Sequence, residues 1–161
     1  MVKKQHIDLE FEMLDVVDFT DAEMRLFKEA CSAATTSYSP YSHFAVGAAA
    51  LLSNGKIVIG SNQENCAYPS GICAERNAVF HAGCSYPNET IVVLCIVAKD
   101  SEGRYTQRPI SPCGACRQVL IESENRNGSP MTILLYGSNG CYRIPSAHAL
   151  MPLTFDSSYL E

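Results

Sequence analysis

Two cysteine-containing segments of this sequence could do chemistry. One is a C-x-x-C at Cys113 and Cys116, and the other places Glu75 two residues after Cys73. An isolated C-x-x-C is as typical of a redox pair as of a metal site. A third cysteine decides for metal, because three thiolates with one open position are typical of a catalytic zinc site. We therefore expect one Zn²⁺ per subunit, with Glu75 facing the open position without ligating.

Two arginines follow these groups directly along the chain. Three thiolates outweigh the charge of Zn²⁺, which makes it a poorer Lewis acid unless positive groups compensate. Arg76 and Arg117 are expected to supply that charge by donating hydrogen bonds to the ligand sulfurs. The alternative is that both guanidinium groups are simply solvated.

Helix starts should position these residues. Good helix formers fill residues 73–84, and Pro112 precedes a second helix over about 113–124. Each helix N-terminus carries about half a positive charge, which favours the thiolate form that a metal needs. Thr20 and Glu23 have the form of a capping box and predict a third helix over about 20–36.

Five strands are expected between and after these helices. The pair Asn54-Gly55 predicts a hairpin of residues 45–52 and 56–62, and the apolar run 91–98 is typical of a buried strand. Two more strands are expected at 131–136 and 142–144. The order predicts an α/β fold, a three-layer α/β/α arrangement with a mixed central sheet of about five strands. Ligands of such sheets bind beyond the carboxyl ends of strands, where helices begin.

Length and composition limit the remaining possibilities. The 161 residues, 47% of them hydrophobic, fit one domain at 19–161, preceded by a leader at 1–18 that shows no clean periodicity. The net charge of −5, without a Lys/Arg cluster, argues against nucleic acid and favours a small neutral ligand. No signal peptide or run of about 20 apolar residues is present, so no membrane partner and a cytoplasmic location with reduced thiols are expected. The cysteines outside the metal set are expected to be small buried hydrophobes: Cys31, Cys66, Cys84, Cys95 and Cys141.

The sequence closely resembles the small cytidine deaminases from about Tyr38 to Phe155. The resemblance rests on five segments in the family's order: S-P-Y-S-H-F-A-V-G-A-A-A at 39–50, G-S-N-Q-E-N at 60–65, Y-P-S-G-I-C-A-E-R at 68–76, S-P-C-G-A-C-R-Q at 111–118 and L-M-P-L-T-F at 150–155. It implies hydrolysis of cytidine and deoxycytidine to uridine and deoxyuridine with release of ammonia, as in pyrimidine salvage.

The resemblance also implies roles for substrate-binding residues. Phe44 would pack against the pyrimidine, Asn62 and Glu64 would hydrogen-bond the ribose hydroxyls, and Ala74 would contact the substrate. The alternatives are that Phe44 belongs to the core and that Asn62 and Glu64 only end a strand.

A homotetramer is a further implication of the resemblance. In it, Tyr68 and Phe155 would approach the site of a neighbouring subunit. The alternative for Phe155 is that a tail aromatic covers its own core.

The expected mechanism centres on one carboxylate. Zinc lowers the pKa of bound water, Glu75 accepts its proton, and the hydroxide attacks C4 of the pyrimidine. Glu75 then protonates N3 and the leaving amine. The alternative is a surface carboxylate stabilised by the helix dipole.

Rival functions remain open at this point. A structural zinc module would use Cys66 as a fourth ligand beside Cys73, Cys113 and Cys116. Within the deaminases, the rivals are an editor of nucleic acid, a nucleotide deaminase and a deaminase of another aminopyrimidine nucleoside such as an antibiotic. The sequence does not choose between cytidine and deoxycytidine.

Overall fold

A mixed six-stranded sheet forms the centre of the molecule. The computed structural model describes residues 2–160. The strands lie in the order β1-β6-β5-β4-β2-β3, and neighbouring strands are antiparallel except for β4 and β5. Their bounds are β1 (Glu12–Leu14), β2 (Ala45–Leu52), β3 (Ile57–Ser61), β4 (Ile91–Lys99), β5 (Thr132–Gly137) and β6 (Gly140–Ile144).

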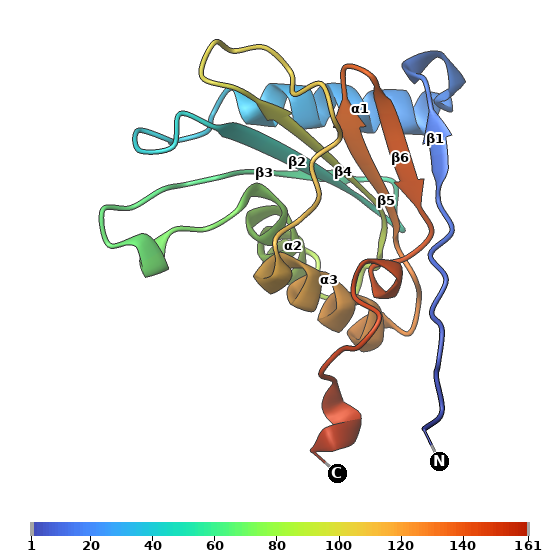
Figure 1. Cartoon of the computed structure of the whole chain (residues 1–161). Coiled ribbons are helices and arrows are strands. Elements are labelled where there is room, and N and C mark those ends of the chain that lie inside the picture. Colours follow the sequence, from blue (N-terminus) through green and yellow to red (C-terminus); the bar gives the residue numbers. More distant parts are fainter. Residues whose placement is uncertain (1, 161) are drawn as a thin grey trace.

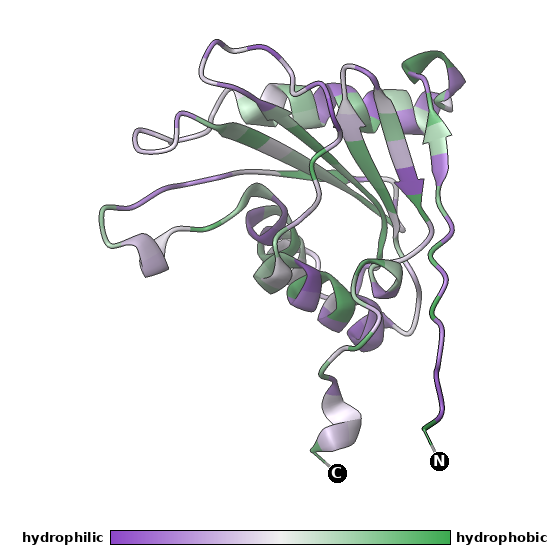
Figure 2. Cartoon of the chain, in the orientation of Figure 1, coloured by the Kyte–Doolittle hydropathy of each residue, from purple (hydrophilic) through white to green (hydrophobic). Residues whose placement is uncertain are grey.

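Helices cover both faces of this sheet, so the expected three layers are confirmed. α1 (Asp21–Ala34) lies on one face, and α2 (Ala74–Ser85) and α3 (Gly114–Asn127) lie together on the other (Figure 1). Figure 2 shows apolar residues running through the central strands between these layers. The α1 side of the sheet buries Leu26, Ala49 and Leu134, and the opposite side buries Leu94, Ile96 and Leu120.

Local sequence signals explain where the helices begin and end. Thr20 caps α1, and Thr20 and Glu23 form the expected capping box. Cys73 and Cys113 are the N-cap residues of α2 and α3. α3 ends at Gly128, whose φ of 60° is in the left-handed region that glycine adopts without strain.

Two glycines let the helices approach the sheet closely. A Cβ on Gly47 of β2 would lie 2.2 Å from the carbonyl oxygen of Ala30 in α1. A Cβ on Gly60 of β3 would lie 2.4 Å from the backbone nitrogen of Ala78 in α2. Glycine at position 60 therefore sets how close α2, with Glu75 in its first turn, lies to the strands.

The sheet has six strands where about five were expected. The additional strand is β1, which lies in the segment 1–18 that the sequence assigned to a leader, and it pairs with β6 along the sheet edge. Arg143 of β6 fixes it there, because its guanidinium binds Glu12 of β1 at 2.8 Å and Glu23 of α1 at 2.9 Å. In residues 2–160, none of the helices is long and apolar enough to cross a membrane.

Candidate metal centre and active site

Three cysteine sulfurs meet at the starts of α2 and α3. The Sγ atoms of Cys73, Cys113 and Cys116 all lie within 4.8 Å of one another. Cys113 Sγ is 4.0 Å from Cys73 Sγ and 3.4 Å from Cys116 Sγ. Tetrahedral Zn²⁺ with bonds of about 2.3 Å would hold sulfurs about 3.8 Å apart, so this set of donors fits zinc.

The helix starts explain why these thiols converge. Cys73 and Cys113 precede the first turns of α2 and α3, and Cys116 lies buried one turn into α3. Hydrogen bonds from Cys116 and Arg76 hold the pKa of Cys73 well below that of a free thiol, while the Cys116 pKa is raised because its proton serves that bond. The surroundings of Cys73 thus favour its thiolate form, which a metal requires.

Glu75 is a buried carboxyl beside this cluster. Only 4% of the residue is exposed, and burial raises its pKa above the ordinary value. A hydrogen bond with the Cys116 thiol lowers the pKa of the Glu75 carboxyl, but the effect of burial is larger, so the pKa is raised. A carboxyl with a raised pKa exchanges protons closer to neutral pH, as a general acid and base must.

The two arginines adjoin the cluster in different ways. Arg76 Nη2 lies 3.8 Å from Cys73 Sγ, as expected. Arg117 donates instead to the carbonyl oxygens of Pro112 at 2.9 Å and Leu150 at 2.7 Å. The expectation of a bond from Arg117 to a sulfur is therefore wrong, because the loop before Cys113 offers stronger oxygen acceptors. Arg117 fixes the loop that carries Cys113.

A cleft of about 470 Å³ opens next to Cys73. Asn62, Glu64 and Tyr68 line it together with Cys73 and Arg76. The residues expected to bind ribose thus share one cleft with Cys73, one of the three expected metal ligands.

Asn62 and Glu64 also hold the wall of this cleft. Asn62 Oδ1 accepts from the Val46 N–H at 2.8 Å, and its Nδ2 donates to the Phe44 carbonyl at 2.9 Å. Glu64 Oε2 accepts from the backbone N–H groups of Tyr41 at 2.9 Å and Ser42 at 3.2 Å. Hydrogen bonds from Ser42 and Tyr41 lower the pKa of Glu64, so it is an anion at neutral pH.

The other substrate-binding candidates have different surroundings. Phe44 is half-buried and packs on the core between the sheet and α2. Ala74 is fully buried and is not among the residues that line this cleft. Phe155, 59% exposed, stacks on Tyr159 in the C-terminal tail and is not among the residues that line this cleft.

Several residues of the cleft were missed by the sequence analysis, and two of them are aromatic or hydroxyl-bearing residues of one segment. Tyr41 and Ser42 line the cleft, and the Tyr41 ring packs edge-on against Tyr68 with centroids 5.9 Å apart. Both belong to the segment S-P-Y-S-H-F, from which only Phe44 was selected. A tyrosine between a proline and the serine that binds Glu64 was the available signal.

The remaining cysteines are all free thiols but not all buried. Cys95 and Cys141 are buried as expected and Cys31 is half-buried, whereas Cys66 and Cys84 are exposed, so the expectation was wrong for those two. Cys66 is not part of the sulfur group that could hold a metal in the described residues. This geometry disfavours a closed four-cysteine site.

Comparisons with known proteins agree with this geometry. Residues 20–128 match the family model for the cytidine and deoxycytidylate deaminase zinc-binding region. A cytidine deaminase of Sporosarcina psychrophila is 41% identical over 137 residues, which are 85% of this chain and 93% of that protein. A cytidine deaminase of Halalkalibacterium halodurans is 45% identical over 97 residues, 60% of this chain and 68% of that protein. The crystal structure of cytidine deaminase from Burkholderia pseudomallei superposes with a TM-score of 0.71 at 37% identity, covering 85% of this chain and 100% of that one.

Proposed function

Since this chain belongs to the zinc-binding cytidine and deoxycytidylate deaminases, we propose that it hydrolyses cytidine and deoxycytidine to uridine and deoxyuridine, releasing ammonia. The family model spans residues 20–128, and the relatives named above are cytidine deaminases. The observation that carries the proposal is the group of three sulfurs with a buried carboxyl beside it, next to a cleft that Cys73 lines together with Asn62 and Glu64.

Cys73, Cys113 and Cys116 would hold the zinc ion. When bound, zinc supplies Lewis acidity that lowers the pKa of a water molecule towards neutrality. Glu75 would take the two protons of that water one after the other at its carboxylate, and would deliver the first to N3 and the second to the leaving amine of the pyrimidine. Burial supports this role, because it raises the pKa of the Glu75 carboxyl.

The cleft favours a neutral nucleoside over a nucleotide. Among its lining residues, Arg76 is the one cationic side chain, and it already donates to Cys73 Sγ. Glu64 adds a negative charge that repels a phosphate and suits the hydroxyl groups of ribose. The free oxygen of Glu64 and the second N–H of Asn62 would bind the sugar, with Phe44 against the base.

The finer points of assembly and location belong to the same proposal. We propose a homo-oligomer, a tetramer by family likeness, in which Tyr68 and Phe155 reach a neighbouring subunit; exposure of 74% and 59% leaves both available. Residues 19–161 would form one deaminase domain, and the segment 1–18 would add β1 to the edge of its sheet. Eight free thiols support a reducing, cytoplasmic location.

A spectrophotometric assay with cytidine tests the function. The matched variants are Glu75→Gln, which keeps the side-chain shape, and Glu122→Gln, which changes an exposed glutamate of α3. We expect wild type and E122Q to convert cytidine, and E75Q to keep zinc but lose at least about 10³-fold in turnover. Near-normal turnover of E75Q would overturn the proposed role of Glu75. A zinc-loaded wild type that does not convert cytidine would overturn the assignment of cytidine as the substrate.

A further inference from the structure

The N-terminal arm, defined here as residues 2–11, alternates in character over residues 7–11. Ile7, Leu9 and Phe11 are apolar, and the residues between them, Asp8 and Glu10, are acidic. A period of two is the pattern of a β-strand with one apolar and one polar face. The arm leads directly into β1, and β1 pairs with β6.

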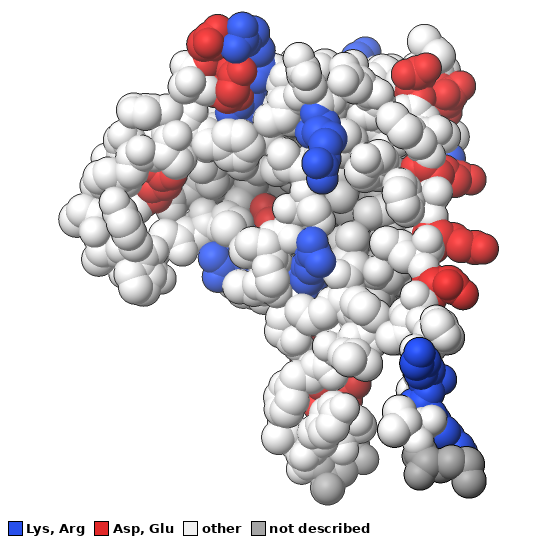
Figure 3. Space-filling model, in the orientation of Figure 1, with Lys and Arg blue, Asp and Glu red and all other residues white. Residues whose placement is uncertain are grey.

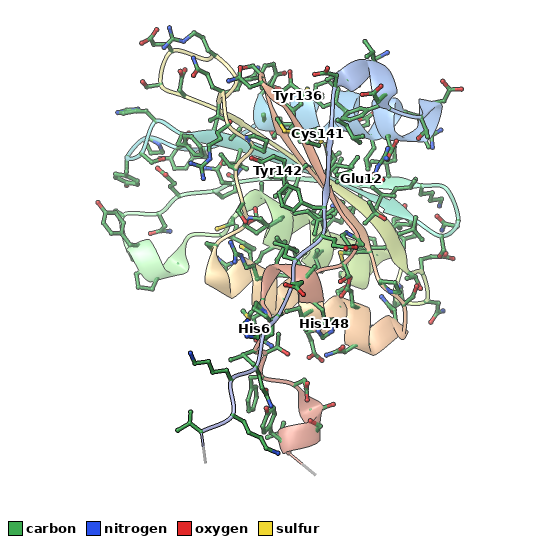
Figure 4. The ribbon with its side chains drawn as sticks, turned by 45° about the vertical axis from the view of Figure 1, so that its right-hand side comes forward. His6, Glu12, Tyr136, Cys141, Tyr142 and His148 are labelled. Carbon is green, nitrogen blue, oxygen red and sulfur yellow. The ribbon has the colours of Figure 1, made fainter. Side chains whose placement is uncertain are left out.

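The apolar face of the arm lies against the body of the protein. Phe11 packs edge-on against Tyr142 of β6 with ring centroids 4.9 Å apart. Ile7 and Leu9, with Asp8 between them, line a cavity that also includes Leu150, so this part of the arm borders the body of the protein. Figure 4 shows the arm crossing the body from Glu12 past Tyr142 to His6.

The hydrogen-bonding edge of the arm has no partner strand in the sheet. β1 is the first strand of the sheet order, and its described register with β6 begins at Glu12. The arm therefore extends an edge strand beyond the sheet. Figure 1 shows its end leading away from the body. An edge strand of this kind is a template for another strand.

Charge along the arm is divided into a basic and an acidic half. Lys3 and Lys4 lie near its beginning, and Asp8, Glu10 and Glu12 follow. Figure 3 shows acidic side chains gathered along the edge where β1 and the arm run, with a basic group at the arm's end. A strand with this division complements an antiparallel copy of itself.

One register pairs the charges of the two arms, although it also places Gln5 opposite Leu9 and Lys3 opposite Phe11. With Ile7 opposite Ile7, Lys4 lies opposite Glu10 and His6 opposite Asp8, each twice by symmetry. A shift of one residue in either direction would place Lys4 opposite Phe11 or Leu9 and Asp8 opposite Ile7 or Gln5, so both charge pairs would be lost. Placing Asp8 on the axis would oppose two like charges, which destabilises a cross-strand pair.

From this pattern we propose that the arms of two copies of this chain pair as an antiparallel β-ribbon centred on Ile7. A two-stranded ribbon is only marginally stable alone, so it adds to contacts that the subunits make elsewhere. The inference does not depend on the deaminase chemistry, since no arm residue lines the cleft beside Cys73.

Disulfide cross-linking of the full-length, zinc-loaded protein tests the ribbon. Opposite residues of an antiparallel pair have Cα atoms about 4.5–5.5 Å apart, within reach of a disulfide. Ile7→Cys should therefore form a covalent dimer under mild oxidation by oxidised glutathione. The wild type is the control for cross-linking through the native thiols. Val17→Cys, at a site outside the arm that is 90% exposed, is the control for disulfides formed by random collision.

Charge reversal in the Ile7→Cys protein tests the register. Adding Glu10→Lys places a lysine of one arm opposite Lys4 of the other, so the cross-linked fraction should fall several-fold. Adding Lys4→Glu to that variant restores opposite charges, so the cross-linked fraction should recover. Cytidine turnover of each variant reports that the fold is intact. Cross-linking of I7C no greater than that of V17C would overturn the proposal, as would a failure of the double reversal to restore it; the free edge would then serve a different protein or none.

Discussion

At the scale of single residues, the metal site depends on three sulfur atoms with unequal exposure. Cys116 is buried, Cys73 is half-buried and Cys113 is exposed. Removing the exposed ligand should therefore cost zinc affinity without opening a cavity in the core.

Cys113→Ala is expected to lose its zinc and its turnover while the chain stays folded. The reason is that Cys113 contributes a ligand sulfur but is not part of either buried apolar cluster. Zinc content per subunit, measured by elemental analysis, checks this. The control is Cys84→Ala, which removes an exposed thiol outside the sulfur group and should retain about one zinc per subunit. Full zinc in C113A would contradict the ligand assignment.

At the scale of helices and strands, the contact of α2 with β3 sets the position of Glu75. Gly60→Ala should destabilise the protein by about 1–3 kcal/mol and reduce turnover, since its Cβ would lie 2.4 Å from the Ala78 nitrogen and 2.5 Å from the Ala74 carbonyl oxygen. Denaturant unfolding and the cytidine assay measure both effects.

Gly83→Ala is the matched control, because Gly83 lies in α2, the helix that Gly60 of β3 contacts. A Cβ at Gly83 would come no closer than 3.7 Å, to an atom of the Arg126 side chain. Because alanine favours a helix, we expect a gain of about 0.5–1 kcal/mol with turnover unchanged. Equal effects of G60A and G83A would mean that close packing of α2 on β3 does not position the site.

The sequence predicted these elements well where a local signal exists. Thr20 with Glu23, Asn54-Gly55 and the run from Ile91 marked α1, the β2–β3 hairpin and β4 to within a few residues. β1 escaped because its strand pairing is with β6, more than 120 positions away, and three residues carry little periodicity of their own. Its extension into the alternation Ile7, Leu9, Phe11 was the overlooked signal.

The candidate site shows the same division between local and distant information. The three cysteines and Glu75 were found from spacing, because each ligand pattern lies within one helix turn. The partners of Arg117 were not, since Leu150 comes from a segment 33 positions away and only the folded chain brings its carbonyl within 2.7 Å.

At the scale of the whole molecule, an ion-pair group joins three elements across 131 positions of sequence. Arg143 binds Glu12 at one side and Glu23 at the other. Burial acts to raise the pKa of Glu23, but hydrogen bonds from Thr20 and Arg143 outweigh it, so the pKa is lowered.

Stability should therefore depend on pH through Glu23. A lowered pKa in the folded state contributes stability that is present above the ordinary glutamate pKa and lost as pH falls through the lowered value. Glu23→Gln, which keeps the capping box shape, should cost about 1–3 kcal/mol near neutral pH and much less below the ordinary glutamate range. Thermal unfolding of the wild type and E23Q, near neutral pH and below the ordinary glutamate range, checks this. A stability difference between the two proteins that does not depend on pH would refute it.

Removal of the metal should separate activity from folding. The apolar layers on both faces of the sheet are built without the ligand sulfurs of Cys73 and Cys113. A chelator is expected to abolish turnover while circular dichroism stays native, and added zinc should restore turnover. Unfolding in step with zinc loss would instead support a structural zinc module.

The crossing of the chain between β4 and β5 has a consequence for how the protein matures. α3 forms that crossover, and it brings Cys113 to Cys73, 40 positions earlier in the sequence. The C-x-x-C alone offers zinc two ligands, and the third comes from a different segment of the folded chain. We therefore expect the newly made chain to fold before it retains its ion, so that protein made without zinc should be folded, inactive and ready to be activated when zinc is supplied.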